Sequence, residues 1–242
     1  MQELHRCHGI AIIAFVMSSQ LVGRGVKAQE MNPPESGDSN RVIAIVGGRL
    51  IDGRGGQPIE RASVVIRGNK IIDVGRKDQV AIPTAAEVID ISGKTVLPGL
   101  IDSHFHSKND LRTPIEFELL RGITSFRDPG HPFKYYELTL RANETLPRIF
   151  LCGGHLDAAP AVHPDQAVVV QDADHARRAV ADHVSKGASA IKIYFRLPIQ
   201  HIRAACESAR QQGVIVTAHL ELVDADEAIA AGVRGIEHVT SF

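Results

Sequence analysis

Two histidines at the end of one short apolar run are the first residues in this sequence that could do chemistry. The run Thr95–His106 reads TVLPGLIDSHFH and ends in His-Phe-His. Because residues two apart on a β-strand point to the same face, we expect His104 and His106 to project side by side, with Phe105 turned the other way into packing. Neutral imidazole is a common zinc ligand, so this pair would form half of a tetrahedral metal shell. The alternative for the pair alone is a strand end with two incidental histidines.

A lysine stands inside a second apolar run, Ala190–Phe195, which reads AIKIYF. The run predicts a buried parallel strand, with Lys192 and Tyr194 on the same face. A lysine is almost never fully buried without a partner, so its place here needs a reason. One reason is chemical, because a deprotonated amine can take up carbon dioxide and become a carbamate that bridges two metal ions. The alternative is an ion-paired or snorkelling lysine.

Two further histidines lie at the carboxyl ends of short apolar strands. His219 comes near the end of VIVTAHL, and His238 ends GIEH. Taken singly, each of these histidines is more often a structural residue than a metal ligand. Together with His104, His106 and Lys192 they recur at one end of successive strand–helix units, which is where barrel enzymes build their active sites.

As a set, these motifs resemble those of the amidohydrolase superfamily, the metal-dependent hydrolases built on a distorted (β/α)8 barrel. PGLIDSHFH resembles the first-strand motif, GITSFRDPG the second strand, IKIY the carboxylated-lysine strand, TAHL the fifth-strand histidine and GIEH the sixth-strand histidine. The similarity runs from about Val42 to Phe242. In detail it looks most like the branch of imidazolonepropionase-like and Xaa-Pro dipeptidase-like enzymes, and the lysine resembles that of binuclear, carbamate-bearing members.

The resemblance implies a centre of two divalent metal ions, zinc being the leading choice, with manganese, iron and cobalt also compatible with these ligands. The first ion would be held by His104 and His106, and the second by His219 and His238. Lys192, as its carbon dioxide adduct, would bridge them. The implied reaction is hydrolysis of an amide-type C–N bond by a metal-activated hydroxide, in a linear substrate such as an Xaa-Pro dipeptide or in a cyclic amide. The alternatives are a non-catalytic metal-binding relative and an inactive fragment.

The strand count departs from the family pattern. A (β/α)8 barrel needs about 250 residues, whereas 148 residues follow Lys94 and provide six predicted strands. In the family, the eighth strand carries an aspartate that binds metal and transfers the proton, and no residue here matches it. We therefore assign no catalytic residue and expect an amino-terminal fragment of a longer protein.

Composition along the chain predicts four segments. Residues 1–28 resemble an export signal whose apolar stretch, Ile10–Met17, is too short to span a bilayer, which predicts a periplasmic or secreted protein without a stable membrane span. A disordered or mistranslated leader is the alternative. Residues 29–41 read as a flexible lead-in and residues 42–94 as the β-rich first part of a composite β-sandwich. Residues 95–242 read as barrel strands one to six of an incomplete (β/α) barrel.

From Thr95 onward the pattern alternates between strands and helices. Helices are predicted over Leu111–Arg121, Phe133–Asn143, Ala173–Lys186, Ile199–Gln212 and Asp224–Ala231. The stretch Gly153–Gln171 shows no element, and a loop of that length is usually functional or disordered. We expect His155 within it to line a substrate pocket, with a plain surface excursion as the alternative. Tyr194 is a second weak candidate for substrate contact, and a packed tyrosine is its alternative.

Composition excludes some classes of function. The net charge is -1 and no basic run occurs, so nothing predicts nucleic-acid binding; a small molecule or dipeptide is the expected partner. The apolar fraction of 44% is enough for a sizeable core. There is no Cys-x-x-Cys zinc motif, and Cys152 and Cys206 are expected to be small buried thiols. The sequence carries no signal for oligomeric state.

Overall fold

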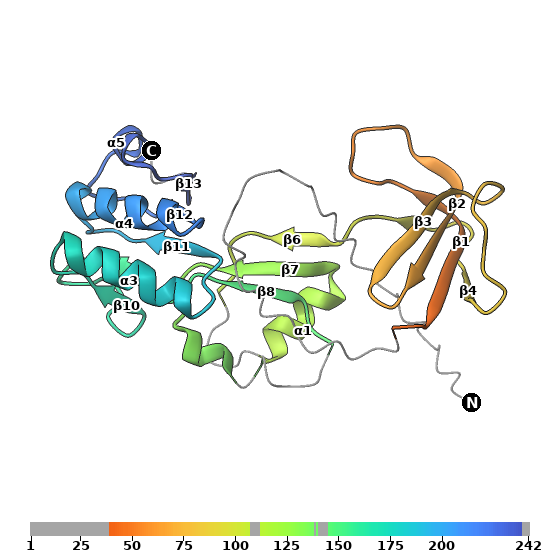
Figure 1. Cartoon of the computed structure of the whole chain (residues 1–242), viewed down its shortest axis with the longest axis horizontal. Coiled ribbons are helices and arrows are strands. Elements are labelled where there is room, and N and C mark those ends of the chain that lie inside the picture. The colour runs from red at the N-terminus through yellow and green to blue at the C-terminus, as the bar shows by residue number, and fades with distance from the viewer. Residues whose placement is uncertain (1–38, 107–111, 138, 140–144, 239–242) are drawn as a thin grey trace, which may run out of the picture. The chain divides into compact units, whose positions relative to one another are not determined.

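The computed structural model describes residues 39–106, 112–137, 139 and 145–238, and the chain divides into two compact units at Leu100 (Figure 1). The predicted export signal and most of the predicted lead-in lie outside the described residues. No helix within the described ranges is both long enough and apolar enough to cross a membrane.

The first unit contains a sheet with the order β3-β2-β1-β4. The short strand β5 also pairs with β1, farther along β1 than β4 does. Its strands are β1 (Val42–Leu50), β2 (Ile59–Arg67), β3 (Lys70–Arg76), β4 (Glu87–Asp90) and β5 (Thr95–Val96). Strands β2 and β3 form a hairpin, in which Arg67 pairs with Lys70 across a two-residue turn. Gly68 takes a φ of +56° in this turn, a conformation that glycine adopts at little cost.

Alternating side chains give this sheet an apolar cluster on each face. Ile45, Val64 and Ile66 belong to one buried cluster, and Ala44, Val46 and Val65 belong to another. Successive residues of β1 and β2 thus alternate between the two clusters, as expected for strands whose two faces are both covered. The β-rich elements expected over residues 42–94 are therefore present, while their membership of a composite sandwich stays a prediction.

The second unit begins with a small sheet of order β6-β7-β8. Its elements are β6 (Leu100–Asp102), α1 (Arg112–Leu120), β7 (Ile123–Asp128) and β8 (Arg148–Leu151). Strands β7 and β8 run parallel, so their carboxyl ends meet at one edge. Phe126 and Leu151 are buried here with Ile115 of α1, in a cluster that also takes in Phe105.

Two predictions for this region are wrong in part. Thr95–His106 is not one strand, because β5 and β6 are separated at Leu97-Pro98-Gly99, where proline lacks the N–H that a ladder requires. His104 and His106 consequently lie beyond the end of β6 instead of within a strand. Over the predicted helix Phe133–Asn143 the structure has a short 3-10 helix, η1 (Phe133–Tyr136), and much of the remainder lies outside the described residues.

A second sheet of order β10-β9-β11-β12-β13 completes the unit. Its elements are β9 (His155–Asp157), β10 (Ala167–Val169), α3 (Ala173–Ser185), β11 (Ala190–Ile193), α4 (Ile199–Gln211), β12 (Ile215–Ala218), α5 (Ala225–Ala231) and β13 (Gly235–Ile236). Neighbouring strands in this sheet run parallel to each other. Helices α3 and α4 lie beside each other against β11 and β12 (Figure 1). The expectation of a long loop over Gly153–Gln171 is wrong, because β9 and β10 lie within it.

Helix ends in this unit follow the local sequence signals. The side chain of Asp172 accepts a hydrogen bond from the backbone N–H of His175 at 2.6 Å, which makes Asp172 the N-cap of α3. The apolar face of α3 and α4 packs on the sheet in one continuous core that includes Ile191, Val180 and Ile202. Cys206 of α4 and Cys152 are free and buried, as expected, and burial raises the pKa of the Cys152 thiol to about 12.

A backbone hydrogen bond connects the two sheets of the second unit. The N–H of Ser189, just before β11, donates to the carbonyl of Leu151 at the end of β8 over 2.8 Å. The order of strands therefore continues from β8 to β11, and the carboxyl ends of β6, β7, β11, β12 and β13 face a common region. This is the edge at which the sequence places its candidate ligands.

Candidate metal centre

His104 and His106 are held by the backbone just after β6. The N–H of Phe105 donates to the carbonyl of Arg127 at 3.0 Å, and the N–H of His104 donates to Asp102 Oδ1 at 2.9 Å. Phe105 stacks edge-on against Phe126, with 4.8 Å between ring centroids. The segment is thus extended, with Phe105 packed into the core and both histidines on the other side, as the spacing predicted.

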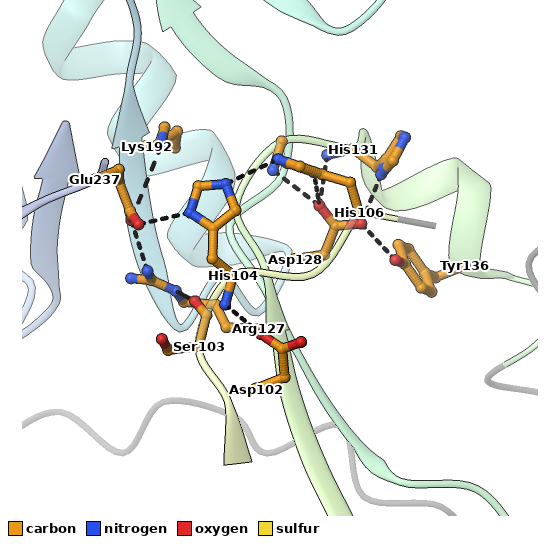
Figure 2. A network of polar contacts seen from close by, with 11 residues as sticks. Asp102, Ser103, His104, His106, Arg127, Asp128, His131, Tyr136, Lys192 and Glu237 are labelled. Carbon is orange, nitrogen blue, oxygen red and sulfur yellow. Dashed lines mark hydrogen bonds and ion pairs between the residues drawn. The ribbon is translucent and has the colours of Figure 1, made fainter. Parts of the chain in front are cut away.

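The two imidazole rings converge on one point. Nε2 of His104 and Nε2 of His106 are 3.1 Å apart (Figure 2). Two imidazole nitrogens bound to one tetrahedral zinc, each at about 2.05 Å, are separated by about 3.3 Å. The observed spacing therefore fits a shared cation.

Lys192 lies close to this pair and is 2% exposed. Within the described chain its Nζ has no hydrogen-bond partner, and the nearest carboxylate oxygen recorded for it is Glu237 Oε1 at 3.9 Å. Burial lowers the pKa of the amine to about 8, against the raising influence of Glu237. A buried amine that has a lowered pKa and makes no hydrogen bond is suited to covalent modification at Nζ.

The second pair of histidines comes from the ends of β12 and β13. The ring of His238 lies between those of His219 and His104, with centroid distances of 4.4 and 4.5 Å. Burial, followed by the nearby His238 and Lys192, lowers the pKa of His219 to about 4, and burial likewise lowers the pKa of His238. Both rings are therefore neutral at pH 7, which is the form that binds metal. His238 has a φ of 67°, an uncommon left-handed backbone for a residue with a side chain.

The sequence-predicted ligands thus come together at one edge. Imidazole nitrogens from four positions are a donor set that divalent zinc and similar ions accept. The spacing of the first pair and the unpartnered Lys192 Nζ support the same conclusion from the geometry. These residues fit a divalent metal centre.

Asp128 is a buried carboxylate that the sequence reading did not single out. It lies at the end of β7, is 0% exposed, and its Oδ1 is 3.2 Å from Nδ1 of His106. The same oxygen accepts the backbone N–H groups of Gly130 and His131, and Oδ2 contacts His131 Nδ1 at 2.6 Å and accepts the hydroxyl of Tyr136. Burial alone would raise the pKa of Asp128, but the hydrogen bonds from His106 and His131 outweigh it and hold the pKa well below its usual range.

A possible metal group of His106, Asp128 and His131 arises from this arrangement, since one ligand atom of each lies within 4.8 Å of the others. The hydrogen bonds of Asp128 argue for a different role. Both of its oxygens already accept hydrogen bonds, and a direct contact of 2.6 Å joins it to His131. We therefore interpret Asp128 as a partner of His106 rather than as a metal ligand.

Glu237 is the second carboxylate that the sequence reading missed, although it is part of the GIEH motif. Its Oε2 lies 2.7 Å from Nδ1 of His104, and its Oε1 accepts from Nη2 of Arg127 at 2.6 Å (Figure 2). Arg127 also donates from Nε to the carbonyl of Ser103 at 2.8 Å. Burial raises the pKa of Glu237, but the hydrogen bond from His104 and the charges of Lys192 and Arg127 outweigh it and lower the pKa to about 2.

His155 and Tyr194 lie next to the histidine cluster. Their ring centroids are 4.3 Å apart, and Tyr194 is 5.2 Å from the ring of His219. His155 is 2% exposed, and its Nε2 has no hydrogen-bond partner within the described residues. The start of this segment, residues 153–157, is buried, whereas most of residues 158–169 are partly or fully exposed, so a substrate-lining role for His155 stays a prediction. Asp157, two residues on, accepts backbone N–H groups of Ala158, Val162 and Arg196 and so fixes the chain locally.

Comparisons with known proteins agree with this geometry. The chain is 37% identical over 67 residues to an imidazolonepropionase of Acinetobacter baumannii, a match that covers 27% of this chain and 17% of that protein. A putative prolidase from Bifidobacterium longum superposes with a TM-score of 0.70 at 26% identity, over 83% of this chain and 55% of that one. A prolidase crystallised with N-methylphosphonate-L-proline gives 0.70 at 28% identity, over 81% and 60%. The chain therefore spans little more than half the length of these solved relatives.

These structural relatives confirm the predicted fold, an α/β barrel of the metal-dependent hydrolase type that is present here in part. The model of the amidohydrolase family matches residues 95–242, which is more than half of the chain. The match includes every candidate ligand and both carboxylates behind them. The chain belongs to the amidohydrolase family.

Proposed function

We propose that the protein to which this chain belongs hydrolyses an amide-type C–N bond at a divalent metal centre. The observation that carries the proposal is the convergence of His104, His106, Lys192, His219 and His238 at one edge of the second unit. Family membership supports the metal dependence, and the prolidase relatives favour a dipeptide with a carboxyl-terminal proline as substrate. A cyclic amide is the second candidate substrate, favoured by the imidazolonepropionase match.

The roles of the chain's own residues follow from their placement. His104 and His106, whose Nε2 atoms face each other, would hold one ion, and His219 and His238, whose rings lie side by side, would hold a second. Bound metal supplies a polarised water as the nucleophile and a Lewis acid for the carbonyl. The low pKa of His219 keeps that ring neutral through the physiological range, so it does not compete for protons while it binds.

Lys192 has the properties that carbamate formation requires. The neutral amine nitrogen bonds to the carbon of carbon dioxide and releases one proton, which leaves an anionic carbamate. A pKa of about 8 leaves a usable neutral fraction of the amine at neutral pH. The negative group formed would lie among neutral imidazoles and beside Arg127, and it would bridge the two ions.

His155 and Tyr194 are proposed to contact the substrate. Burial lowers the pKa of His155 to about 4, so its ring is neutral at pH 7, and its unpartnered Nε2 can still donate or accept one hydrogen bond. The Tyr194 ring lies between His155 and His219 and offers an apolar surface. This placement suits recognition of the part of a small substrate that lies away from the scissile bond.

Lys192→Ala tests the proposal most directly. The variant should lose the second metal equivalent and the hydrolysis of Xaa-Pro dipeptides, and short carboxylic acids such as acetate or propionate should restore part of both. Metal content is measured by elemental analysis after gel filtration, and hydrolysis by release of free proline. In the parent protein, removal of carbon dioxide should weaken metal binding, and bicarbonate should restore it.

Lys186→Ala is the matched control, because Lys186 is an exposed lysine whose Nζ pairs with Asp182 on helix α3. It should retain metal and activity at the parent level. Full metal content and unchanged hydrolysis in Lys192→Ala would exclude the bridging role. A parent protein that binds metal but hydrolyses none of a panel of dipeptides and cyclic amides would instead favour a non-catalytic metal-binding protein.

A further inference from the structure

Each histidine of the first pair meets a different carboxylate with its second ring nitrogen. Nδ1 of His104 is 2.7 Å from Glu237 Oε2, and Nδ1 of His106 is 3.2 Å from Asp128 Oδ1. Figure 2 shows the two rings between these carboxylates, with both Nε2 atoms turned toward each other. The arrangement is nearly symmetric although the two carboxylates come from different strands.

These contacts determine where each ring carries its proton. An ionised carboxylate can only accept hydrogen bonds, so each Nδ1 must donate. In a neutral imidazole a proton on Nδ1 leaves a lone pair on Nε2. Two lone pairs facing each other at 3.1 Å repel in the absence of a cation, and a shared metal ion turns that repulsion into two bonds.

We propose that Asp128 and Glu237 are the positioning residues of this metal centre, which hold His106 and His104 as Nδ1–H tautomers so that both Nε2 lone pairs converge on one ion. The inference rests on the proposed function, because it assigns roles at the same centre. Neither carboxylate binds the metal or the substrate in this account. Each acts through the histidine it contacts.

Asp128 is itself fixed by its own turn. Backbone N–H groups of Gly130 and His131 donate to Oδ1, and the Tyr136 hydroxyl donates to Oδ2. Gly130 also allows the close approach of the ring, since a Cβ at this position would lie 3.0 Å from Cε1 of His106. The His106 ring is therefore confined between the carboxylate and the backbone of residue 130.

Glu237 is fixed by a cation from another strand. Arg127 donates from Nη2 to Oε1 at 2.6 Å and from Nε to the carbonyl of Ser103, the residue before His104. One guanidinium thus aligns both the carboxylate and the backbone that carries the ring. The remaining oxygen of Glu237, Oε2, is directed at His104.

Asp128→Ala and Glu237→Gln test the assignment. Asp128→Ala removes the acceptor at Nδ1 of His106, whereas an asparagine would keep one, because the backbone N–H groups of Gly130 and His131 would hold its oxygen at the Oδ1 position. In Glu237→Gln, Arg127 holds the amide oxygen at the Oε1 position, so the amide N–H faces Nδ1 of His104 and moves the ring proton to Nε2. We expect each variant to bind zinc or cobalt about 10- to 100-fold more weakly, the usual cost of losing such a partner. Competition with a chromophoric chelator measures the affinity, and the absorption spectrum of bound cobalt reports its ligand geometry.

Asp102→Asn is the matched control in the same segment. Asp102 accepts the backbone N–H of His104 at 2.9 Å, a contact that an asparagine oxygen can also accept, and it leaves the ring unaffected. This variant should bind metal within about threefold of the parent. Parent-like affinity and cobalt spectrum in both Asp128→Ala and Glu237→Gln would overturn the proposal without contradicting the metal centre itself.

A measurement on the metal-free parent protein keeps the test independent of variant folding. Nitrogen-15 NMR of the imidazole rings distinguishes Nδ1–H from Nε2–H tautomers, and His104→Gln and His106→Gln assign the two signals. Nδ1–H on both rings is the expected result, and Nε2–H on either would overturn the proposal for that residue. If the parent binds no metal while both rings are Nδ1–H, the metal centre fails and the carboxylate assignment stands.

Discussion

The two histidine pairs at the centre are held in different ways. His104 and His106 each have a carboxylate at Nδ1, and their Nε2 atoms face each other at 3.1 Å. In the described part of the chain, the rings of His219 and His238 make no hydrogen bond to a carboxylate. They lie against other aromatic rings instead, with His219 4.3 Å from Phe195 and 4.4 Å from His238 between centroids.

The difference indicates that the two histidine pairs are prepared for metal binding by different interactions. Hydrogen bonds fix ring rotation and tautomer in the first pair. In the second pair, partial desolvation together with the nearby Lys192 lowers the pKa of both rings, and the position of the strand ends, including the left-handed backbone of His238, places them. The first pair is therefore the preorganised half, which should bind metal before the second does.

The largest expected effect comes from removing a ligand of the preorganised pair. His106→Ala should weaken the tighter of two metal-binding steps by more than about 100-fold. Loss of a ligand should cost more than loss of a residue that only hydrogen-bonds to a ligand, which costs about 10- to 100-fold. His219→Ala should leave that step intact and weaken the other. Isothermal titration of the apo protein with zinc resolves the two steps. Equal losses in the same step from both variants would break the distinction between the pairs.

A smaller effect is expected from the cation that holds Glu237. Arg127→Met removes the guanidinium from a pair whose side chains are 19% and 8% exposed. Breaking a buried pair costs about 3–5 kcal/mol, and because Glu237 keeps His104 as a partner we expect about 2–3 kcal/mol of unfolding free energy to be lost. Urea unfolding followed by circular dichroism measures it.

Arg177→Met is the control for that loss. Arg177 pairs with Asp174 on the surface of α3, with side chains 45% and 78% exposed, and such pairs contribute about 0–1 kcal/mol. A loss from Arg127→Met no larger than that from Arg177→Met would show that Glu237 needs no cation. Glu237 would then be held at His104 without the guanidinium.

The smallest effect concerns His183, a buried histidine away from the centre that shows what burial alone does. Nε2 of His183 donates to the carbonyl of Gly154 at 2.7 Å, and burial lowers the pKa of the ring below 6.5. As pH falls below 6.5 the unfolded chain takes up this proton before the folded chain does, so stability is lost on acidification. His183→Gln should flatten the fall in unfolding free energy between pH 7 and pH 5, measured by urea titration. An unchanged slope would contradict this origin.

The candidate ligands were predictable because they depend on local pattern. A histidine or lysine at the carboxyl end of an apolar run is placed by the strand itself, and parallel strands bring such ends together. This reasoning located Lys192 and His219 without knowledge of the packing. It also predicted the opposite orientation of Phe105, although the segment that carries it proved to lie beyond β6.

The carboxylates were missed because their roles depend on contacts between distant parts of the chain. Glu237 and His104 are 133 positions apart, and no periodicity in the sequence connects them. The signal was nevertheless adjacent to recognised motifs, since Glu237 precedes His238 in GIEH and Asp128 lies in GITSFRDPG. Strands β9 and β10 were missed for another reason. Three residues each are too few for an alternating pattern to be seen.

The ion pair between Arg127 and Glu237 links the two sheets of the second unit. It joins β7 of one sheet to the residue that follows β13 of the other across 110 positions of chain, and the Ser189–Leu151 hydrogen bond is a second link between the two sheets. Through the bridging group proposed for Lys192, the ion at His104 would be tied to the ion at His238 and would close a comparable loop, as a disulfide does in a secreted protein. Such an ion is then a cross-link as well as a reagent, and a chelator would act on this chain as a mild denaturant.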